Sequence, residues 1–221
     1  MSNALALLLW GLVVGLDLVS IGQFMIARPL VAGTVAGLLV GDPGAGVAVG
    51  LVLELFALDV MPVGAVRYPD YGLGAIAATA VAAGAPAELA LGLGVVLGLV
   101  VAMAGEFGSH LVREANAAAT MTQEPALAAG DARTVTRLHG GGLLRDGARA
   151  LIVCGLGLAL AAVVRSTALM GARAAVLLGA VMVGCAIGTA ATGALRVTGR
   201  REHVGWLAAG VAAGLLVVMI A

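Results

Sequence analysis

The chain has 221 residues, of which 62% are hydrophobic and 11% charged, and its 12 acidic and 12 basic side chains give a formal net charge of zero. Soluble proteins average about 45 to 50% apolar and about 25% charged residues, so this composition predicts an integral membrane protein. The sequence contains no lysine, which excludes a Walker A phosphate loop and a lysine Schiff base.

Glycine accounts for 34 residues and aromatic residues for only 3%, so we expect helices that pack by close approach of their backbones. Many glycines recur four residues apart, the spacing that lets membrane helices touch. These sets are Gly33-Gly37-Gly41, Gly46-Gly50, Gly94-Gly98, Gly184-Gly188 and Gly210-Gly214. The two cysteines, Cys154 and Cys185, lie in apolar runs without metal-ligand spacing, and we expect both to be buried.

The first hydrophobic stretch, residues 4–26, is long enough to span about 30 Å of hydrocarbon as one helix. It contains Asp17 and Gln23, which we expect to face protein or a cavity. The next two stretches, 30–40 and 45–60, are short or interrupted by acids, and they predict half-spanning or re-entrant pieces. Two further apolar stretches cover residues 73–87 and 89–105.

A helix break separates the second stretch from the third, and it consists of Gly41, Asp42, Pro43 and Gly44. Proline lacks a donor and clashes with the preceding turn, while glycine accepts dihedral angles that end a helix. Unpaired backbone groups at membrane depth are tolerated only inside protein or beside a water-filled cavity. The sequence therefore predicts two short helices that meet near a polar pocket, although Asp42 is also an ordinary turn and cap residue.

Residues 106–149 interrupt the apolar pattern with many charged side chains and predict one or two interfacial amphipathic helices, with a hinge at Gly140-Gly141-Gly142. Three further spans are expected over residues 150–164, 174–195 and 204–221. The predicted fold is an all-α polytopic membrane protein with short or re-entrant broken helices. Its predicted regions are residues 1–105, which hold the candidate site, the extramembrane segment 106–149, and the last spans, 150–221.

Arginines indicate the orientation of the chain in the membrane. The segment 106–149 carries five arginines and the connection 196–201 carries three, whereas the connection between them carries only Arg165 and Arg173. Positively charged loops are retained in the cytoplasm. We therefore expect the segment 106–149 to be cytoplasmic.

Glu54 is the leading candidate for a functional residue, because it lies inside an apolar stretch. A charged side chain at mid-bilayer costs about 2.5 to 3.5 kcal/mol on insertion scales, so it persists only where something solvates it. A buried carboxylate can accept hydrogen bonds from the hydroxyl groups of a solute. The alternatives are a structural partner for Arg28 or Arg67, or a protonated carboxyl group.

Three further polar residues are weaker candidates for substrate binding. Asp70 follows Pro69, which is also a common turn signal. Arg28 precedes a proline at a predicted helix start and is either a counter-charge near the pocket or an interfacial anchor. Gln23 offers donor and acceptor groups to a polyol. The histidines lack the spacing that a metal site requires, so we expect no metal site and no cofactor.

At these residues the chain resembles a known family. The order and spacing of its motifs are similar to those of the membrane subunit IIC of mannose-type (mannose, fructose and sorbose) sugar permeases of the phosphotransferase system (PTS). The resemblance is close over roughly the first 85 residues. Its residues are Arg28-Pro29-Leu30, Gly37, Gly41-Asp42, Gly46, Gly50, Leu53-Glu54-Leu55, Ala57-Leu58, Gly64 and Pro69-Asp70.

The resemblance implies a sugar-translocating subunit of the cytoplasmic (inner) membrane that performs no phosphoryl chemistry itself. It implies a hexose substrate, a IID membrane subunit, a soluble IIAB phosphocarrier and an oligomeric assembly, and no nucleic acid. The glutamate that matches Glu54 lies in the sugar-binding region of the family. Asp59 stands where the family commonly has glycine, so it adds a second carboxylate near Glu54. Two alternatives stay open: a transporter of another small polar solute, or a non-transporting regulatory or scaffold module.

Overall fold

The computed structural model describes residues 2–60, 66–167 and 171–198, and its regular secondary structure in these ranges is entirely α-helical. The all-α prediction is therefore confirmed. The helices are α1 (Ser2–Asp17), α2 (Pro29–Val40), α3 (Pro43–Ala57), α4 (Tyr71–Ala82), α5 (Ala87–Met121), α6 (Glu124–Ala128), α7 (Ala132–Ser166) and α8 (Ala172–Thr198).

The first helix is shorter than the sequence predicts. α1 ends at Asp17, and its carboxylate accepts hydrogen bonds from the backbone N–H groups of Phe24 (2.6 Å) and Ala27 (3.1 Å). These bonds hold the following loop against the end of α1, and Gln23 in that loop has a positive φ of 53°. The prediction of one continuous helix over residues 4–26 is therefore wrong, and Gln23 lies in an exposed loop.

Helices α2 and α3 form a short antiparallel hairpin. Arg28 precedes Pro29 at the start of α2, and Gly41 ends that helix with a φ of 83°. Asp42 then caps α3 through a 3.0 Å hydrogen bond from the backbone N–H of Ala45. At 12 and 15 residues, the two helices are about 18 and 22 Å long, so neither crosses a bilayer alone.

Glycines make the close contact between α2 and α3. A Cβ atom added at Gly33 would lie 2.7 Å from the carbonyl oxygen of Gly46, and one at Gly50 would lie 2.8 Å from that of Pro29. The four-residue spacing of glycines in both helices therefore packs backbone against backbone, as the sequence predicts. The spacing at Gly184-Gly188 in α8 makes no such contact, because nothing described lies within 4 Å of either added Cβ.

We expect Gly46→Ala to destabilise the protein and Gly44→Ala to leave it unchanged or slightly more stable. The new methyl group at position 46 would clash with the carbonyl oxygen of Gly33, whereas at position 44 its nearest neighbour would be 3.6 Å away. Overpacking of this kind costs about 1 to 3 kcal/mol. Thermal unfolding of the two purified variants in detergent measures the difference, and equal melting temperatures would contradict the packing described here.

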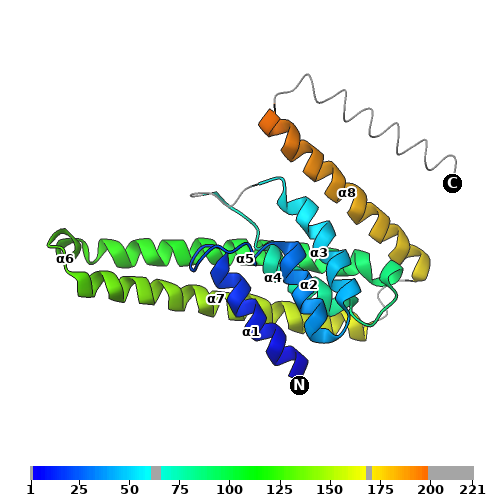
Figure 1. Cartoon of the computed structure of the whole chain (residues 1–221), viewed down its shortest axis with the longest axis horizontal. Coiled ribbons are helices and arrows are strands. Elements are labelled where there is room, and N and C mark those ends of the chain that lie inside the picture. Colours follow the sequence, from blue (N-terminus) through cyan, green and yellow to red (C-terminus); the bar gives the residue numbers. More distant parts are fainter. Residues whose placement is uncertain (1, 61–65, 168–170, 199–221) are drawn as a thin grey trace.

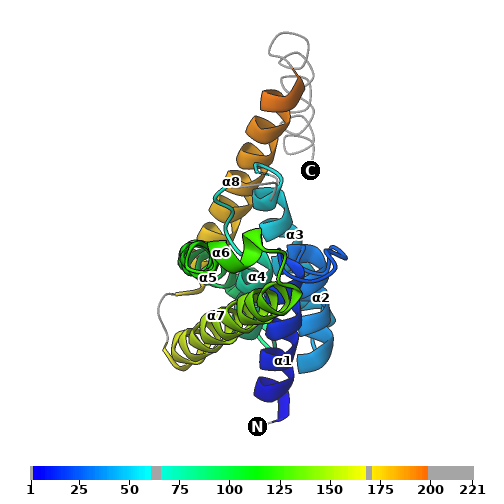
Figure 2. The same ribbon diagram turned by 90° about the vertical axis from the view of Figure 1, so that its left-hand side faces the viewer.

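The core of the protein forms around α4. This helix is apolar on all sides and nearly every residue in it is buried, as expected for a helix surrounded by others. It packs against α2, α3, α5 and α7, and Figure 2 shows it enclosed by them. The largest completely buried side chains nearby are Leu53, Leu73 and Ile76.

Helices α5 and α7 lie side by side and project well beyond the other helices, with α6 at the tip (Figure 1). The hinge predicted at Gly140-Gly141-Gly142 is wrong, because α7 runs unbroken through these residues. A glycine inside a helix costs only about 1 kcal/mol. Here Asn116 of α5 packs 3.4 Å from the position of a Cβ at Gly142 and accepts a 2.9 Å hydrogen bond from Arg145.

No helix ends at residue 105 or 149, since both positions lie inside α5 and α7. The predicted division into 1–105, 106–149 and 150–221 therefore remains a prediction about the membrane and does not follow the helix boundaries. Three described segments are long and apolar enough to cross a bilayer: Leu89–Met121, Ala132–Ser166 and Ala172–Thr192.

Helix α8 packs against α3 and α5. It carries Cys185, which is exposed, so the prediction of burial is wrong for this cysteine and confirmed for Cys154. The outer face of α8 has no described partner to cover it. The span predicted over residues 204–221 lies outside the described residues.

Candidate functional site

The structure pairs Glu54 with Arg28. Both Nε and Nη2 of Arg28 donate to Oε1 of Glu54, with a distance of 2.7 Å from Nε, and the backbone N–H of Leu30 donates to Oε2 at 3.2 Å. The two side chains keep 18% (Glu54) and 26% (Arg28) of their surface exposed. A carboxylate has about four lone-pair sites, so Oε2 retains the capacity to accept another hydrogen bond from a solute.

The predicted residue Asp59 and the tyrosine Tyr68 lie in the segments around this pair. Asp59 directly follows α3, the helix that carries Glu54, and it interacts electrostatically with Tyr71. Tyr68 is buried, packs edge-to-face on Tyr71 with 5.5 Å between ring centroids, and interacts electrostatically with Arg28 and Glu54. The end of α3, the start of α2 and the start of α4 therefore bring a mixture of charged and aromatic side chains together.

A cleft of about 350 Å³ lies at the base of the α5–α7 projection, and we call it the basal cleft. Tyr68 lines it and so links it to the Arg28–Glu54 pair. Its volume falls within the range of about 300 to 1,000 Å³ that is typical of small-molecule sites. Its other lining residues are Leu18, Val19, Arg67, Glu106, Ser109, His110, Arg113, Glu114 and Ala117.

Asp70 belongs to a buried ionic cluster, which we call the buried triad: Asp70, Arg149 and Asp146. Nη1 of Arg149 donates to Asp70 at 2.7 Å, and its Nε donates to Asp146 at 2.7 Å. All three side chains are at most 3% exposed. Nη2 of Arg149 donates to the backbone carbonyl of Gly15 at 3.1 Å. The triad therefore ties α1, α4 and α7 together, and Asp70 has no surface open to a solute.

The helix break does not surround Glu54. Asp42 and Glu54 lie at opposite ends of α3, about 18 Å apart at 1.5 Å per residue. The carboxylate of Asp42 accepts from Ala45 and, at 2.9 Å, from the backbone N–H of Gly84. The expected polar pocket formed by Gly41, Asp42, Pro43 and Gly44 around Glu54 is therefore wrong, because the break is the turn of a hairpin and Glu54 lies at its open end.

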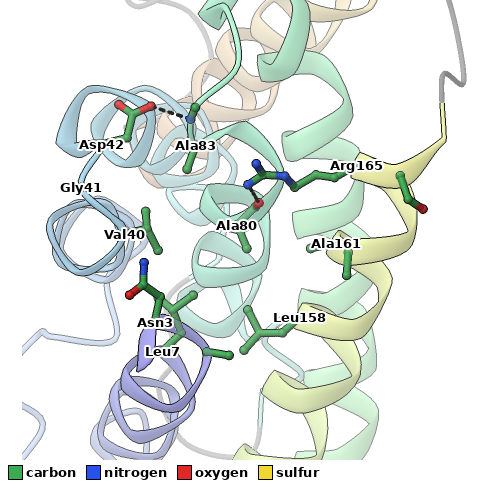
Figure 3. Close-up of a pocket in the computed structure, with 14 residues that line it drawn as sticks. Asn3, Leu7, Val40, Gly41, Asp42, Ala80, Ala83, Leu158, Ala161 and Arg165 are labelled. Carbon is green, nitrogen blue, oxygen red and sulfur yellow. Dashed lines mark hydrogen bonds between the residues drawn. The ribbon is translucent and has the colours of Figure 1, made fainter. Parts of the chain in front are cut away.

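The break lines a different cavity, of about 820 Å³, which we call the turn cavity (Figure 3). It opens between the start of α1, the α2–α3 turn, the end of α4 and the last turns of α7. Arg165 reaches across it to donate a 3.1 Å hydrogen bond to the carbonyl of Ala80. Its other walls are mainly small and apolar, with Leu7, Leu158 and Ala161 among them. The turn cavity thus lies at the turn of the α2–α3 hairpin, whereas the basal cleft is formed by the loop after α1, the loop before α4 and α5.

Sequence reasoning missed Arg149, Asp146 and the basal cleft. Arg149 and Asp146 were grouped with an extramembrane segment because charged residues are frequent around them. The signal that could have found them is the arginine at the start of the last apolar stretch of α7, where an unpaired charge would be costly. Ser20 adds to the cluster, because its hydroxyl donates to Asp146.

A family model described as the sorbose-specific IIC component of the PTS matches residues 1–210. The chain belongs to this IIC family. The family resemblance inferred from the motifs is therefore confirmed.

Curated IIC relatives match parts of the chain. A sorbose-specific EIIC component from Klebsiella pneumoniae is 33% identical over 149 residues, covering 67% of this chain and 54% of the relative. A mannose-specific EIIC component from Escherichia coli K12 is 31% identical over 131 residues, covering 59% and 48%. A fructose permease IIC component from Bacillus subtilis is 36% identical over 86 residues, covering 39% and 31%. The chain thus spans about half the length of the mannose and sorbose relatives.

A solved structure described only as a membrane protein shares the fold. It superposes with a TM-score of 0.69, covering 99% of this chain and 96% of the other, at 20% sequence identity. The helix arrangement of this IIC chain is therefore that of a known membrane protein.

Proposed function

We propose that the chain is the sugar-translocating IIC subunit of a mannose-type PTS permease. It binds a hexose inside the membrane and presents it to a partner that phosphorylates it, so the chain itself is not an enzyme. Glu54 accepts hydrogen bonds from sugar hydroxyl groups, and Arg28 orients that carboxylate. Gln23 and Asp59 lie in the segments that flank this pair and contact the rest of the sugar.

The observation that carries this proposal is the partial exposure of a carboxylate on a short apolar helix. Glu54 is held in position by three donors from Arg28 and Leu30, yet 18% of its side chain is accessible and Oε2 can accept one more donor. Hydrogen bonds to charged groups contribute about 1.5 to 3 kcal/mol, and they discriminate strongly in favour of a hydroxyl-rich ligand. Asp70, in contrast, serves the site by fixing the loop before α4 rather than by touching sugar.

The turn of the α2–α3 hairpin lines the turn cavity, whereas the other end of the hairpin carries the Arg28–Glu54 pair, and this arrangement suits alternating access. Half-spanning helices that meet a solute near mid-membrane are a recurring design in transporters. Because glycines line the contact between α2 and α3, the hairpin is a compact unit that can move as one body. We infer that its movement against α5 and α7 exposes the sugar first to the turn cavity and then to the basal cleft.

The proposed setting is the cytoplasmic membrane, in several passes, with the α5–α7 projection in the cytoplasm. That projection carries Arg113, Arg133, Arg137 and Arg145, in line with the preference of positive charge for the cytoplasmic side. It is the proposed docking surface for the soluble IIAB partner. A IID membrane subunit and further copies of the chain complete the assembly.

Uptake of labelled hexose tests the proposal. Cells that produce the chain with IID and IIAB partners should take up the sugar, and excess unlabelled mannose, fructose or sorbose should compete. A second candidate is transport of another small polar solute, which the additional carboxylate of Asp59 favours; polyols or amino sugars would then compete where hexoses do not. If no solute is taken up while the assembly forms in the membrane, the chain is a scaffold and the proposal is wrong.

A further inference from the structure

We propose that the basal cleft is a separate subsite for the phosphorylated product, a hexose monophosphate. This inference rests on the proposed function, because the sugar leaves a PTS permease as a phosphate ester. No residue of the Arg28–Glu54 pair takes part in it. The subsite is formed by the loop before α4 and by one face of α5.

The charges of the cleft fit a ligand with an anionic and a hydroxyl-bearing end. Arg67 and Arg113 supply guanidinium groups, which match the geometry of a phosphate group. Glu106 and Glu114 supply carboxylates, which accept hydrogen bonds from hydroxyl groups, although Oε1 of Glu114 already lies 3.3 Å from Nε2 of His110. The two guanidinium and two carboxylate charges cancel, so the lining suits a sugar phosphate better than a bare anion.

Two donors in the cleft have no partner among the described residues. The side chain of Arg67 is exposed and makes no hydrogen bond or ion pair with the residues that the structure describes. The hydroxyl group of Ser109 is buried and has no hydrogen-bond partner within residues 2–60, 66–167 and 171–198. Arg113 instead donates to the carbonyl of Val66 at 3.0 Å, which fixes the loop that carries Arg67 beside the cleft. Arg67 is therefore the residue on which phosphate binding should depend most.

The position of the cleft agrees with a sequence in which the sugar is phosphorylated beside Glu54 and the product is then released into the cytoplasm. Tyr68 lines it and interacts electrostatically with Arg28 and Glu54, so the two sites are adjacent. The α5 residues that line the cleft, from Glu106 to Ala117, belong to the half of α5 that the proposed orientation assigns to the cytoplasm. A sugar phosphorylated beside Glu54 would move into the cleft before release.

Calorimetric titration of the full chain in nanodiscs of neutral phosphatidylcholine tests the inference. The ligands are mannose, fructose and sorbose, their monophosphate esters, and inorganic phosphate. We expect Arg67→Gln to weaken binding of the ester about tenfold or more and to leave binding of the parent sugar unchanged, because it removes a charge-assisted hydrogen bond to the phosphate group. Arg67→Lys keeps the charge and should retain most of the affinity.

Arg133→Gln is the matched control, because it removes an exposed arginine near the tip of the projection and should change neither affinity. The inference is overturned if the ester does not bind while the parent sugar does, or if Arg67→Gln leaves ester binding unchanged. It is also overturned if an Arg67-dependent signal arises only from phosphatidylglycerol in the nanodisc, since the occupant is then a lipid headgroup. Failure of the proposed function looks different, because no parent sugar would bind even to the unaltered chain.

Discussion

Replacing Arg149 with methionine is expected to destabilise the protein by about 3 to 5 kcal/mol, enough to prevent accumulation of folded chain. The substitution keeps an unbranched apolar side chain but removes the guanidinium group, so it leaves Asp70 and Asp146 buried without their counter-charge. Both carboxylates are at most 3% exposed, so water cannot replace the guanidinium group. Size-exclusion profiles and melting temperatures in detergent measure the loss.

Two variants separate the lost charge from the lost packing. Arg133→Met removes an exposed arginine from the same helix and should change stability by less than about 0.5 kcal/mol. The triple variant Asp70→Asn, Asp146→Asn, Arg149→Met removes every charge of the buried triad and should recover much of the stability, because no unpaired ion remains. An Arg149→Met protein as stable as the unaltered chain would contradict the role given to the triad.

Glu54→Gln is expected to weaken hexose binding by at least tenfold while the chain still inserts and assembles. Glutamine has the same shape but loses the charge, so both the pair with Arg28 and the strong hydrogen bonds to sugar hydroxyl groups are lost. The effect on stability should be modest, because both side chains of the Arg28–Glu54 pair keep part of their surface exposed and a polar glutamine can still accept from Arg28 and Leu30. Equilibrium binding to the purified chain, with and without a co-produced IID subunit, gives the affinity.

Glu124→Gln serves as the control for this prediction, because Glu124 is an exposed carboxylate on α6, at the tip of the projection. It should leave both affinity and stability unchanged. A purely structural role for Glu54 predicts a different pattern, in which the melting temperature falls and the remaining folded chain binds sugar normally.

The α2–α3 hairpin could be predicted from the sequence. The ionic contacts around it, which are the Arg28–Glu54 pair and the buried triad, could be predicted only in part. A turn is predicted by the local chemistry of Gly41, Asp42 and Pro43 alone. The four-residue spacing of the glycines predicts the close packing of α2 against α3. Arg28 was one of the possible partners of Glu54, because the two residues are separated by little more than one hairpin. Features of this kind can be predicted from the sequence because residues close together in the chain determine them.

The buried triad, the end of α1 and the unbroken course of α7 depend on contacts between segments that are distant in the sequence. Arg149 and Asp70 are 79 residues apart, and no period along α7 indicates which of its residues meets the start of α4. Asp17 ends α1 by binding backbone groups of the next loop, a contact that hydrophobicity does not reveal. Gly140, Gly141 and Gly142 suggested a hinge, but packing against α5 outweighed the small cost of glycine in a helix.

The most direct measurement is a cryo-EM map of the chain assembled with a IID subunit and saturated with a transported hexose. We expect sugar density beside the basal cleft, with one sugar hydroxyl group about 2.6 to 3.2 Å from the carboxylate of Glu54. Sugar density confined to the turn cavity, with Glu54 bonded only to Arg28 and Leu30, would contradict it.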